Sequence, residues 1–206
     1  VAYKDGSDTA GTVGGVVRGT ATNPGDTING IVLNSGDAGV QYNFGEYQLA
    51  SLSGHVNLTD PDGNCAGPGV NAPALADVLV TLLDASGATV FTTRTNANGE
   101  YSFAGLLPGT YSVVEQTPTG LINGEAHIGV VNGTTVGTKG QTDTITAIVL
   151  TSGQQGLDYD FCEHAPASLA GNVFHDRGND GAFEPGDDGI ASVQIELRNA
   201  GGDDQR

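Results

Sequence analysis

The sequence has no methionine and no tryptophan, and only seven basic residues stand against 24 acidic ones, so the formal net charge is −17. Such an acidic surface repels nucleic acid phosphates and anionic lipids, which argues against both as partners. It attracts hard divalent cations such as Ca²⁺, whose preferred ligands are carboxylate and carbonyl oxygens. A second explanation, that the charge only keeps a secreted protein soluble, stays open at this point.

The sequence also lacks any sustained helical periodicity, because glycine or proline interrupts every candidate window. Its 33 glycines are combined with many Val, Thr and Ile residues, a composition that favours short strands joined by turns. We therefore predict an all-β protein. No apolar run is long enough to span a bilayer, so we expect no membrane insertion of this segment.

Residues suited to catalysis are equally scarce. The two cysteines, Cys65 and Cys162, cannot form a zinc site without histidines, and the four histidines do not have ligand spacing. No Ser–His–Asp, Cys–His or paired-carboxylate arrangement stands out, and no glycine-rich phosphate loop follows a strand. We expect that the protein is not an enzyme.

The most informative feature is an internal repeat. Residues 27–56 and 144–173 share the frame T-I-x-x-I-V-L-x-S-G-x-x-G-x-x-Y-x-F-x-E, followed by A-S-L-x-G-x-V, at an offset of about 117 residues. Residues 74–87 resemble residues 189–202 in the same way. An offset of this size is typical of a domain rather than of a solenoid repeat.

The repeat predicts three parts. Residues 1–47 are the C-terminal part of one repeat, residues 48–164 are a complete repeat, and residues 165–206 are the N-terminal part of a further repeat. The two end fragments together would still lack the equivalent of residues 92–118, so we expect neither to fold alone. Two explanations stay open, a window cut from a longer tandem array and pairing with a neighbouring chain.

A hairpin with one buried face is predicted for the stretch "GEYSFAGLLPGTYSVVE", residues 99–115. Tyr101 and Phe103 alternate with small polar residues, and Tyr111 and Val113 do the same beyond a Pro-Gly turn. We expect these four side chains to be in the core.

Residues 95–121 and 171–197 carry motifs that resemble a known family. The first stretch fits the pattern N-x-N/D-G-x-Y-x-F-x-x-L-x-P-G-x-Y-x-V-x-E of the B-type domains of bacterial surface adhesins, the SdrD B-like and Cna-B-like superfamily. The resemblance implies tandem prealbumin-like (Ig-like) β-sandwich domains, which serve as stalks on the bacterial cell surface. It also implies an extracellular location.

The stretch "HDRGNDGAFEPGDDG" has the spacing of a calcium loop. Counting from Asp176 as position one, the ligand positions five, seven, nine and twelve and the sharp-turn glycine at six are occupied by Asp180, Ala182 (through its carbonyl), Glu184, Asp187 and Gly181. Gly178 at position three has no side-chain oxygen, and Asp187 is shorter than the usual Glu. We predict a weak Ca²⁺ site, with a solvated acidic turn as the alternative.

The equivalent loop of the complete repeat offers a second, less regular set of oxygens. Asp60, Asp62 and Asn64 alternate, and Asp77 could return to the site after the turn. The prolines and glycines of this loop suit a plain turn equally well, so both interpretations stay open.

In the family's sandwich the first and last strands lie close together, so the resemblance implies a disulfide between Cys65 and Cys162; two separate thiols are the alternative. Some members carry a Lys–Asn isopeptide bond assisted by a buried acid. Glu115 holds the acid-like position, but Lys4 and Lys139 lie in the wrong segment. We therefore expect no isopeptide bond, and we expect Glu115 to be a structural or strand-edge carboxylate.

Together these features predict a calcium-rigidified structural module of an extracellular stalk, fibre or adhesin, whose partners are neighbouring repeats of the same or adjacent chains. One rival is a module that binds host protein or carbohydrate. Another is a subunit of a filament in which chains complete one another's sandwiches by strand exchange.

Overall fold

The computed structural model describes residues 2–60, 72–141 and 143–198, and within these ranges the regular structure is all strand. The chain divides into two compact units, Val1–Pro166 and Ala167–Arg206. Among the described residues no helix exists that could cross a membrane. The predicted all-β class is confirmed.

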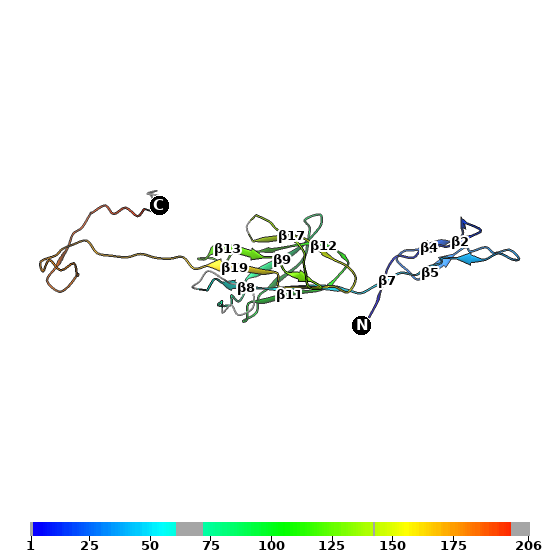
Figure 1. Ribbon diagram of the computed structural model, residues 1–206, viewed down its shortest axis with the longest axis horizontal. Coiled ribbons are helices and arrows are strands. Elements are labelled where there is room, and N and C mark those ends of the chain that lie inside the picture. The colour runs from blue at the N-terminus through cyan, green and yellow to red at the C-terminus, as the bar shows by residue number, and fades with distance from the viewer. Residues whose placement is uncertain (1, 61–71, 142, 199–206) are drawn as a thin grey trace. The chain divides into compact units, whose positions relative to one another are not determined.

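Residues 50–164 form a two-sheet structure, called the middle sandwich below (Figure 1). Its first sheet has five strands in the order β10-β9-β12-β17-β16. All pairs in this sheet are antiparallel. The strands are β9 (Leu79–Asp84), β10 (Thr89–Arg94), β12 (Gly109–Glu115), β16 (Thr138–Lys139) and β17 (Thr144–Leu150).

The second sheet is organised around its longest strand, β8 (Ala50–Leu58). Along one edge β8 pairs in parallel with β18 and then with β19, and β11 pairs with it antiparallel. The path continues from β19 to β13 and from β18 through β14 to β15. These strands are β11 (Glu100–Leu106), β13 (Ile122–His127), β14 (Val130–Val131), β15 (Thr134–Thr135), β18 (Gln155–Leu157) and β19 (Asp160–His164).

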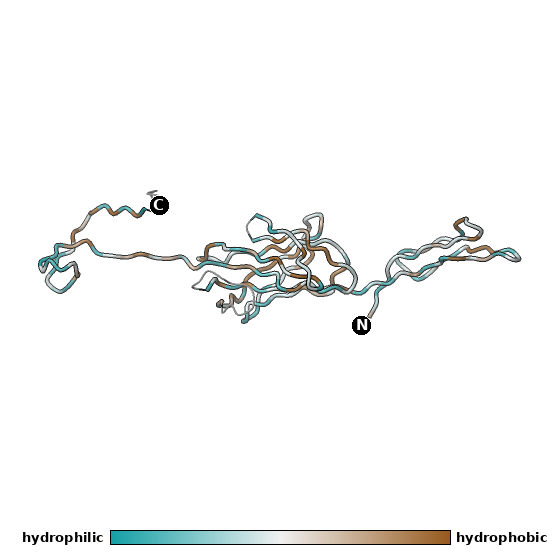
Figure 2. The backbone as a smooth tube through the Cα atoms, in the orientation of Figure 1, coloured by the Kyte–Doolittle hydropathy of each residue, from teal (hydrophilic) through white to brown (hydrophobic). Residues whose placement is uncertain are grey.

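The core of the middle sandwich comes from alternating side chains of both sheets. Strand β8 alternates buried and half-buried residues along its first seven positions, as expected when one face of a strand is covered. Figure 2 shows hydrophobic stretches, in brown, intermingled with hydrophilic ones in this part of the chain. The fully buried apolar residues include Leu52, Val56, Val80, Leu82, Val113, Ile145, Ile148, Leu150, Tyr159 and Phe161.

The predicted hairpin of residues 99–115 is wrong in its pairing, although its buried face is confirmed. Strand β11 pairs with β8, whereas β12 pairs with β9 and β17 in the other sheet. The Pro-Gly segment therefore crosses between sheets, where the Tyr111 hydroxyl donates a hydrogen bond to the Leu107 carbonyl at 2.7 Å. Tyr101 and Tyr111 are buried from opposite sheets, which periodicity alone cannot distinguish from one hairpin face.

Residues 2–47 repeat the strand pairings of the middle sandwich's second half. Pairs β1–β7, β2–β3, β2–β6 and β4–β5 correspond in order to β13–β19, β14–β15, β14–β18 and β16–β17. The strands are β1 (Lys4–Asp5), β2 (Thr12–Val13), β3 (Val16–Val17), β4 (Thr20–Thr22), β5 (Thr27–Asn29), β6 (Gly39–Val40) and β7 (Glu46–Tyr47). The domain boundaries predicted at residues 47 and 164 stay a prediction.

The unit Ala167–Arg206 contains one short antiparallel pair in its described part. Strand β20 (Phe174–His175) pairs with β21 (Asp188–Gly189), and the Phe174 and Phe183 rings lie 5.2 Å apart. These strands close the ends of the acidic stretch.

A close approach at Gly54 joins β8 to the segment between β18 and β19. A Cβ added to Gly54 would lie 1.8 Å from the Tyr159 carbonyl oxygen, which is backbone and cannot move aside cheaply. We expect Gly54→Ala to lower the free energy of unfolding of the middle sandwich by about 3 kcal/mol, the upper range for an overpacked core. Urea unfolding followed by tyrosine fluorescence measures the change.

The matched control is Gly171→Ala, because Gly171 occupies the same place in the A-S-L-x-G-x-V motif. An added Cβ there meets nothing within 4 Å, so this variant should unfold like the parent. Equal stability of both variants would contradict the steric role of Gly54.

Candidate metal centres

The acidic loop, residues 176–187, is closed by backbone pairing at its base. His175 and Asp188 are register partners across β20 and β21. Arg177 forms an ion pair with Asp188 just inside this pair. Positive φ angles of 55° at Asn179 and 78° at Gly181 turn the chain sharply, and only glycine and, less often, asparagine adopt such angles readily.

Carboxylates at both ends of the acidic loop accept hydrogen bonds from its backbone. The Asp176 carboxylate accepts from the N–H groups of Asn179 and Gly181, the latter at 2.7 Å. The Gly181 hydrogen bond, with further backbone donors, lowers the pKa of Asp176 below its usual range. The Asp187 carboxylate accepts from the N–H groups of Arg177 at 3.1 Å and Glu184 at 3.2 Å. Both carboxylates are thereby directed at the backbone of the loop.

The glycine at position three leaves space on which two other carboxylates converge. A Cβ on Gly178 would lie 3.5 Å from an Asp180 oxygen and 3.6 Å from a Glu184 oxygen. The Ala182 N–H donates to Asp180 at 2.9 Å. Three carboxylate oxygens of this loop do not, however, come within 4.8 Å of one another. The loop thus gathers the predicted residues in one turn, and its Ca²⁺ site stays a prediction.

The predicted ligands of the other loop are only partly described. Asp62 and Asn64 lie outside the described residues, and Asp60 is half-buried shortly after β8. Asp77 has φ 62° and a carboxylate 3.4 Å from the Arg94 guanidinium, so this acid already has a cationic neighbour. A Ca²⁺ site here stays a prediction.

Cys162 is buried on β19 opposite Asn57 of β8 and is not a free thiol. Cys65 lies outside the described residues, so the Cys65–Cys162 disulfide stays a prediction. The parallel pairing of β8 with β19 does place the first and last strands of the repeat side by side, as the bridge would require.

A group of acids not predicted as ligands lies inside the middle sandwich. Its members, Glu115, Asp143 and Glu163, bring one carboxylate oxygen each within 4.8 Å of the others, and they are called the interior acid cluster below. Glu115 ends β12, Asp143 precedes β17, and Glu163 is on β19. The cluster therefore takes residues from both sheets. Of the two roles expected for Glu115, a position at a sheet edge is wrong, because β12 lies between β9 and β17; the structural role stays a prediction.

Burial dominates the electrostatics of the interior acid cluster. Glu115 is 3% exposed and Glu163 is 0% exposed, and no hydrogen-bond donor of the described residues reaches any of their four carboxylate oxygens. Burial, followed by repulsion from Glu163 and Asp143, raises the pKa of Glu115 to about 9. Burial and repulsion from Asp143 raise the pKa of Glu163 to about 7. Without a cation, a protonated carboxyl group of one glutamate can donate a hydrogen bond to the carboxylate of the other. The pair then carries one negative charge in place of two.

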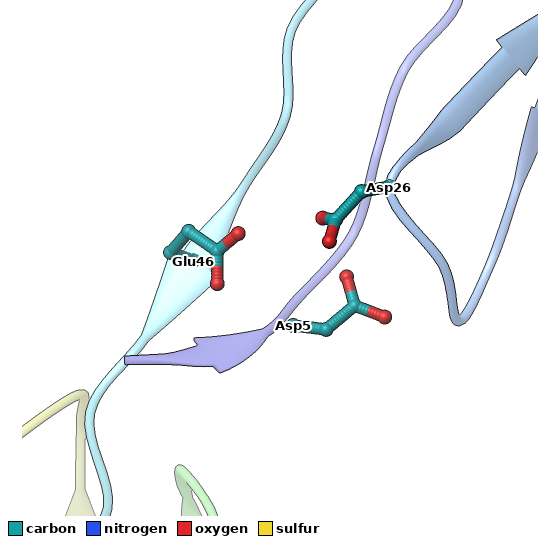
Figure 3. A group of neighbouring side chains, drawn as sticks. All are labelled: Asp5, Asp26 and Glu46. Atoms are coloured by element: carbon teal, nitrogen blue, oxygen red, sulfur yellow. The ribbon is translucent and has the colours of Figure 1, made fainter. Parts of the chain in front are cut away.

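A second group of acids occupies the equivalent place in residues 2–47. Asp5, Asp26 and Glu46, the N-terminal acid cluster, also bring one oxygen each within 4.8 Å. Figure 3 shows the carboxylates of Asp5 in β1, Glu46 in β7 and Asp26 in the turn before β5 gathered together. Burial and repulsion from Asp26 and Asp5 raise the pKa of Glu46. The sequence carried a signal for both clusters, because Asp26 and Glu46 match Asp143 and Glu163 at the repeat offset.

The raised pKa values predict how stability depends on pH in EDTA. The folded state keeps protons on Glu115 and Glu163 that the unfolded chain, with pKa near 4.5, has already released. The free energy of unfolding should therefore fall as pH rises from about 5 to 9, by up to about 1.4 kcal/mol per pH unit for each proton. Urea unfolding across this range measures the slope.

The double variant Glu115→Gln/Glu163→Gln should flatten that slope, because neither amide titrates. Glu125→Gln, at an exposed glutamate of β13, should keep it. A slope unchanged in the double variant would show that the stability change arises elsewhere.

A family model and curated relatives match this chain. The model of the SdrD B-like domain matches residues 54–162, more than half of the sequence. Serine-aspartate repeat-containing protein E of Staphylococcus aureus (strain USA300) is 31% identical over 164 residues, which is 79% of this chain and 13% of that protein. Serine-aspartate repeat-containing protein C of Staphylococcus aureus (strain Newman) is 31% identical over 176 residues, which is 85% of this chain and 17% of that protein. The chain thus spans less than a fifth of these relatives.

Solved structures give only a weak likeness. The Bacillus anthracis TIE protein aligns with a TM-score of 0.37 and 14% identity, over 67% of this chain and 24% of that one. The group B streptococcus pilus 2b backbone protein aligns with a TM-score of 0.26 and 17% identity, over 69% of this chain and 53% of that one. The sandwich, its sequence motifs and the match to residues 54–162 agree, and the chain belongs to the SdrD B-like domain family.

Proposed function

We propose that this chain is a structural module in an extracellular stalk or fibre on a bacterial surface, in contact with neighbouring repeats. The observation that carries the proposal is the recurrence of four strand pairings, in the same order, in residues 2–47 and 122–164. Tandem copies of one sandwich in a single chain can build an extended structure whose length grows with the number of copies, as a surface stalk requires. Relatives with serine-aspartate repeats in their names support the same role.

The module has no enzymatic role in this proposal. Neither acid cluster is combined with a nucleophile or a histidine base among the described residues, and the chain belongs to a family defined by a domain of surface proteins. Ca²⁺ is its cofactor, bound by the acidic loop, where it would fix the turn between β20 and β21. Its contribution follows mass action, so a weak site acts only where calcium is abundant, as outside cells.

Trypsin tests the calcium role of the acidic loop directly, because Arg177 lies inside it and Arg198 lies outside it in the same unit. With 5 mM Ca²⁺ in place of EDTA we expect cleavage after Arg177 to slow at least about fivefold relative to cleavage after Arg198, since an ordered loop fits a protease poorly. Mass spectrometry of the fragments gives both rates in one sample.

The variant Asp176→Ala/Asp180→Ala should lose this protection while cleavage after Arg198 stays the same. Cleavage after Arg177 that ignores Ca²⁺ in the parent chain would reduce the loop to an acidic turn.

Strand exchange between chains is the second candidate, and a specific surface favours it. Leu33 and Phe44 are 54% and 51% exposed, whereas Leu150 and Phe161 at the equivalent positions are 1% exposed. In the middle sandwich the strands of residues 50–115 cover this face. The same strands from a neighbouring repeat would fit it.

Light scattering after size exclusion tests this candidate. We expect a mass above that of the monomer at about 100 μM chain, falling on dilution, and a monomer for Leu33→Ser/Phe44→Ser. Leu169→Ser, at an exposed leucine of the other unit, is the control. A monomer at every concentration would rule out exchange.

A further inference from the structure

We propose that the interior acid cluster is a second kind of cation site, in which Glu115, Asp143 and Glu163, with the side-chain oxygen of Asn123, hold one hard divalent ion such as Ca²⁺. It is separate from the acidic loop, and it does not rest on the proposed function. Three features support this site: the spacing of its carboxylates, its buried oxygens without donors, and the recurrence of the same positions in residues 2–47.

The geometry fits a single ion. Ca²⁺ binds oxygens at 2.3–2.6 Å, so two ligands on opposite sides of it are about 5 Å apart. The three carboxylate oxygens of the interior acid cluster all lie within 4.8 Å of one another. One Ca²⁺ can therefore touch all three without a change of backbone.

Five buried oxygens of this region have no donor among the described residues, whereas the Asp143 Oδ2 atom accepts a hydrogen bond from the Thr117 hydroxyl at 2.7 Å. Both oxygens of Glu115, both of Glu163 and the Oδ1 atom of Asn123 are buried without a hydrogen-bond partner. Asn123 is the register partner of Glu163 across β13 and β19, so its side chain is on the same face of the sheet. A shared proton satisfies the two glutamates only in part and does nothing for Asn123. A cation satisfies all of them, which removes the large cost of buried, unpaired acceptors.

No basic side chain in the described part of the chain forms an ion pair with Glu115, Asp143 or Glu163. Among the described residues the ion pairs involve other acids, such as Asp160 with His55 and Glu125 with Lys139. Three carboxylates so close together repel one another strongly at low dielectric. A hollow of about 220 Å³ is lined by Asp143, Glu125 and Lys139, among others, and its Lys139 ammonium is paired with Glu125. An ion from solvent could reach Asp143 through this hollow.

The same positions recur in the N-terminal acid cluster. Asp26 and Glu46 match Asp143 and Glu163, and Asp5 matches Asn123, since Asp5 pairs with Glu46 as Asn123 pairs with Glu163. The next residues, Gly6 and Gly124, confirm this alignment. An added Cβ on them would lie 2.6 Å from the Gly45 carbonyl and 2.3 Å from the Cys162 carbonyl, which are themselves equivalent.

The replacement of Asn123 by Asp5 also keeps the charge. Residues 2–47 contain no counterpart of Glu115, so an asparagine at position 5 would leave only two carboxylates; with aspartate the cluster has three, as inside the middle sandwich. The Oδ1 atom of Asp5 is buried without a partner, like that of Asn123. Two copies that differ in residue type but agree in oxygen position and charge indicate a shared ligand.

The test uses the full chain with Asp176→Ala/Asp180→Ala, so that the acidic loop cannot contribute. We expect its melting temperature to rise by at least about 5 °C between EDTA and 5 mM Ca²⁺. Adding Glu115→Gln/Glu163→Gln should raise the melting temperature in EDTA, because buried charge is removed, and should abolish the calcium-dependent rise. Adding Glu100→Gln, at an exposed glutamate of β11, should leave both values unchanged.

Equilibrium dialysis against Ca²⁺ counts the ions independently of stability. The interior double variant should bind one ion fewer than the loop variant, and Asp5→Asn/Asp26→Asn should remove one ion without changing the melting of the middle sandwich. If the Glu115/Glu163 variant fails to fold, Asp143→Asn, at a half-buried position, replaces it. A calcium-dependent rise that survives loss of the glutamates, or no rise and no bound ion in the loop variant, would overturn the proposal. Either result leaves the trypsin test of the acidic loop unaffected.

Discussion

The close contact of β8 with the segment around Tyr159 is the constraint on which the sandwich depends. It allows the first strand of the repeat to pair with β18 and with β19 along a single edge, across about a hundred residues of sequence. The Tyr159 N–H donates to the Ser53 carbonyl at 3.2 Å, and the Tyr101 hydroxyl donates to the Tyr159 carbonyl at 2.5 Å. With β18, β19 and β11 fixed on β8, the buried faces of the two sheets meet in one core.

The class of fold could be predicted from the sequence for two reasons. Strand periodicity is visible within a short window, and the internal repeat is visible when the sequence is aligned with itself. The sequence pattern placed Tyr101, Phe103, Tyr111 and Val113 in the core correctly. It failed on the pairing of β11 and β12, because a Pro-Gly turn between two alternating strands looks the same whether the chain reverses within a sheet or crosses between sheets. Hydrogen-bond partners that are distant in sequence decide this, and a pattern cannot show them.

The two candidate sites also differ in whether their residues are close together in the sequence. The acidic loop could be found by counting, since its residues lie within a dozen positions of one another. The interior acid cluster could not, because Glu115, Asp143 and Glu163 come from separate strands and meet only in the folded sandwich. Motif comparison even pointed away from it, since the missing lysine made Glu115 look incidental. The repeat did contain a clue, the matching acids before β5 and β17 and in β7 and β19, but only the strand register shows that Asp5 stands where Asn123 does.

The parallel pairing of β8 with β19 has a mechanical consequence. These strands are the first and last of the middle sandwich, so the chain enters it at one end and leaves it at the other. Tension along the chain then pulls the two strands past each other along their length. The hydrogen bonds between them share such a load and must break together, whereas antiparallel terminal strands joined at one end would open one bond at a time. A repeat built in this way resists stretching through its strand order.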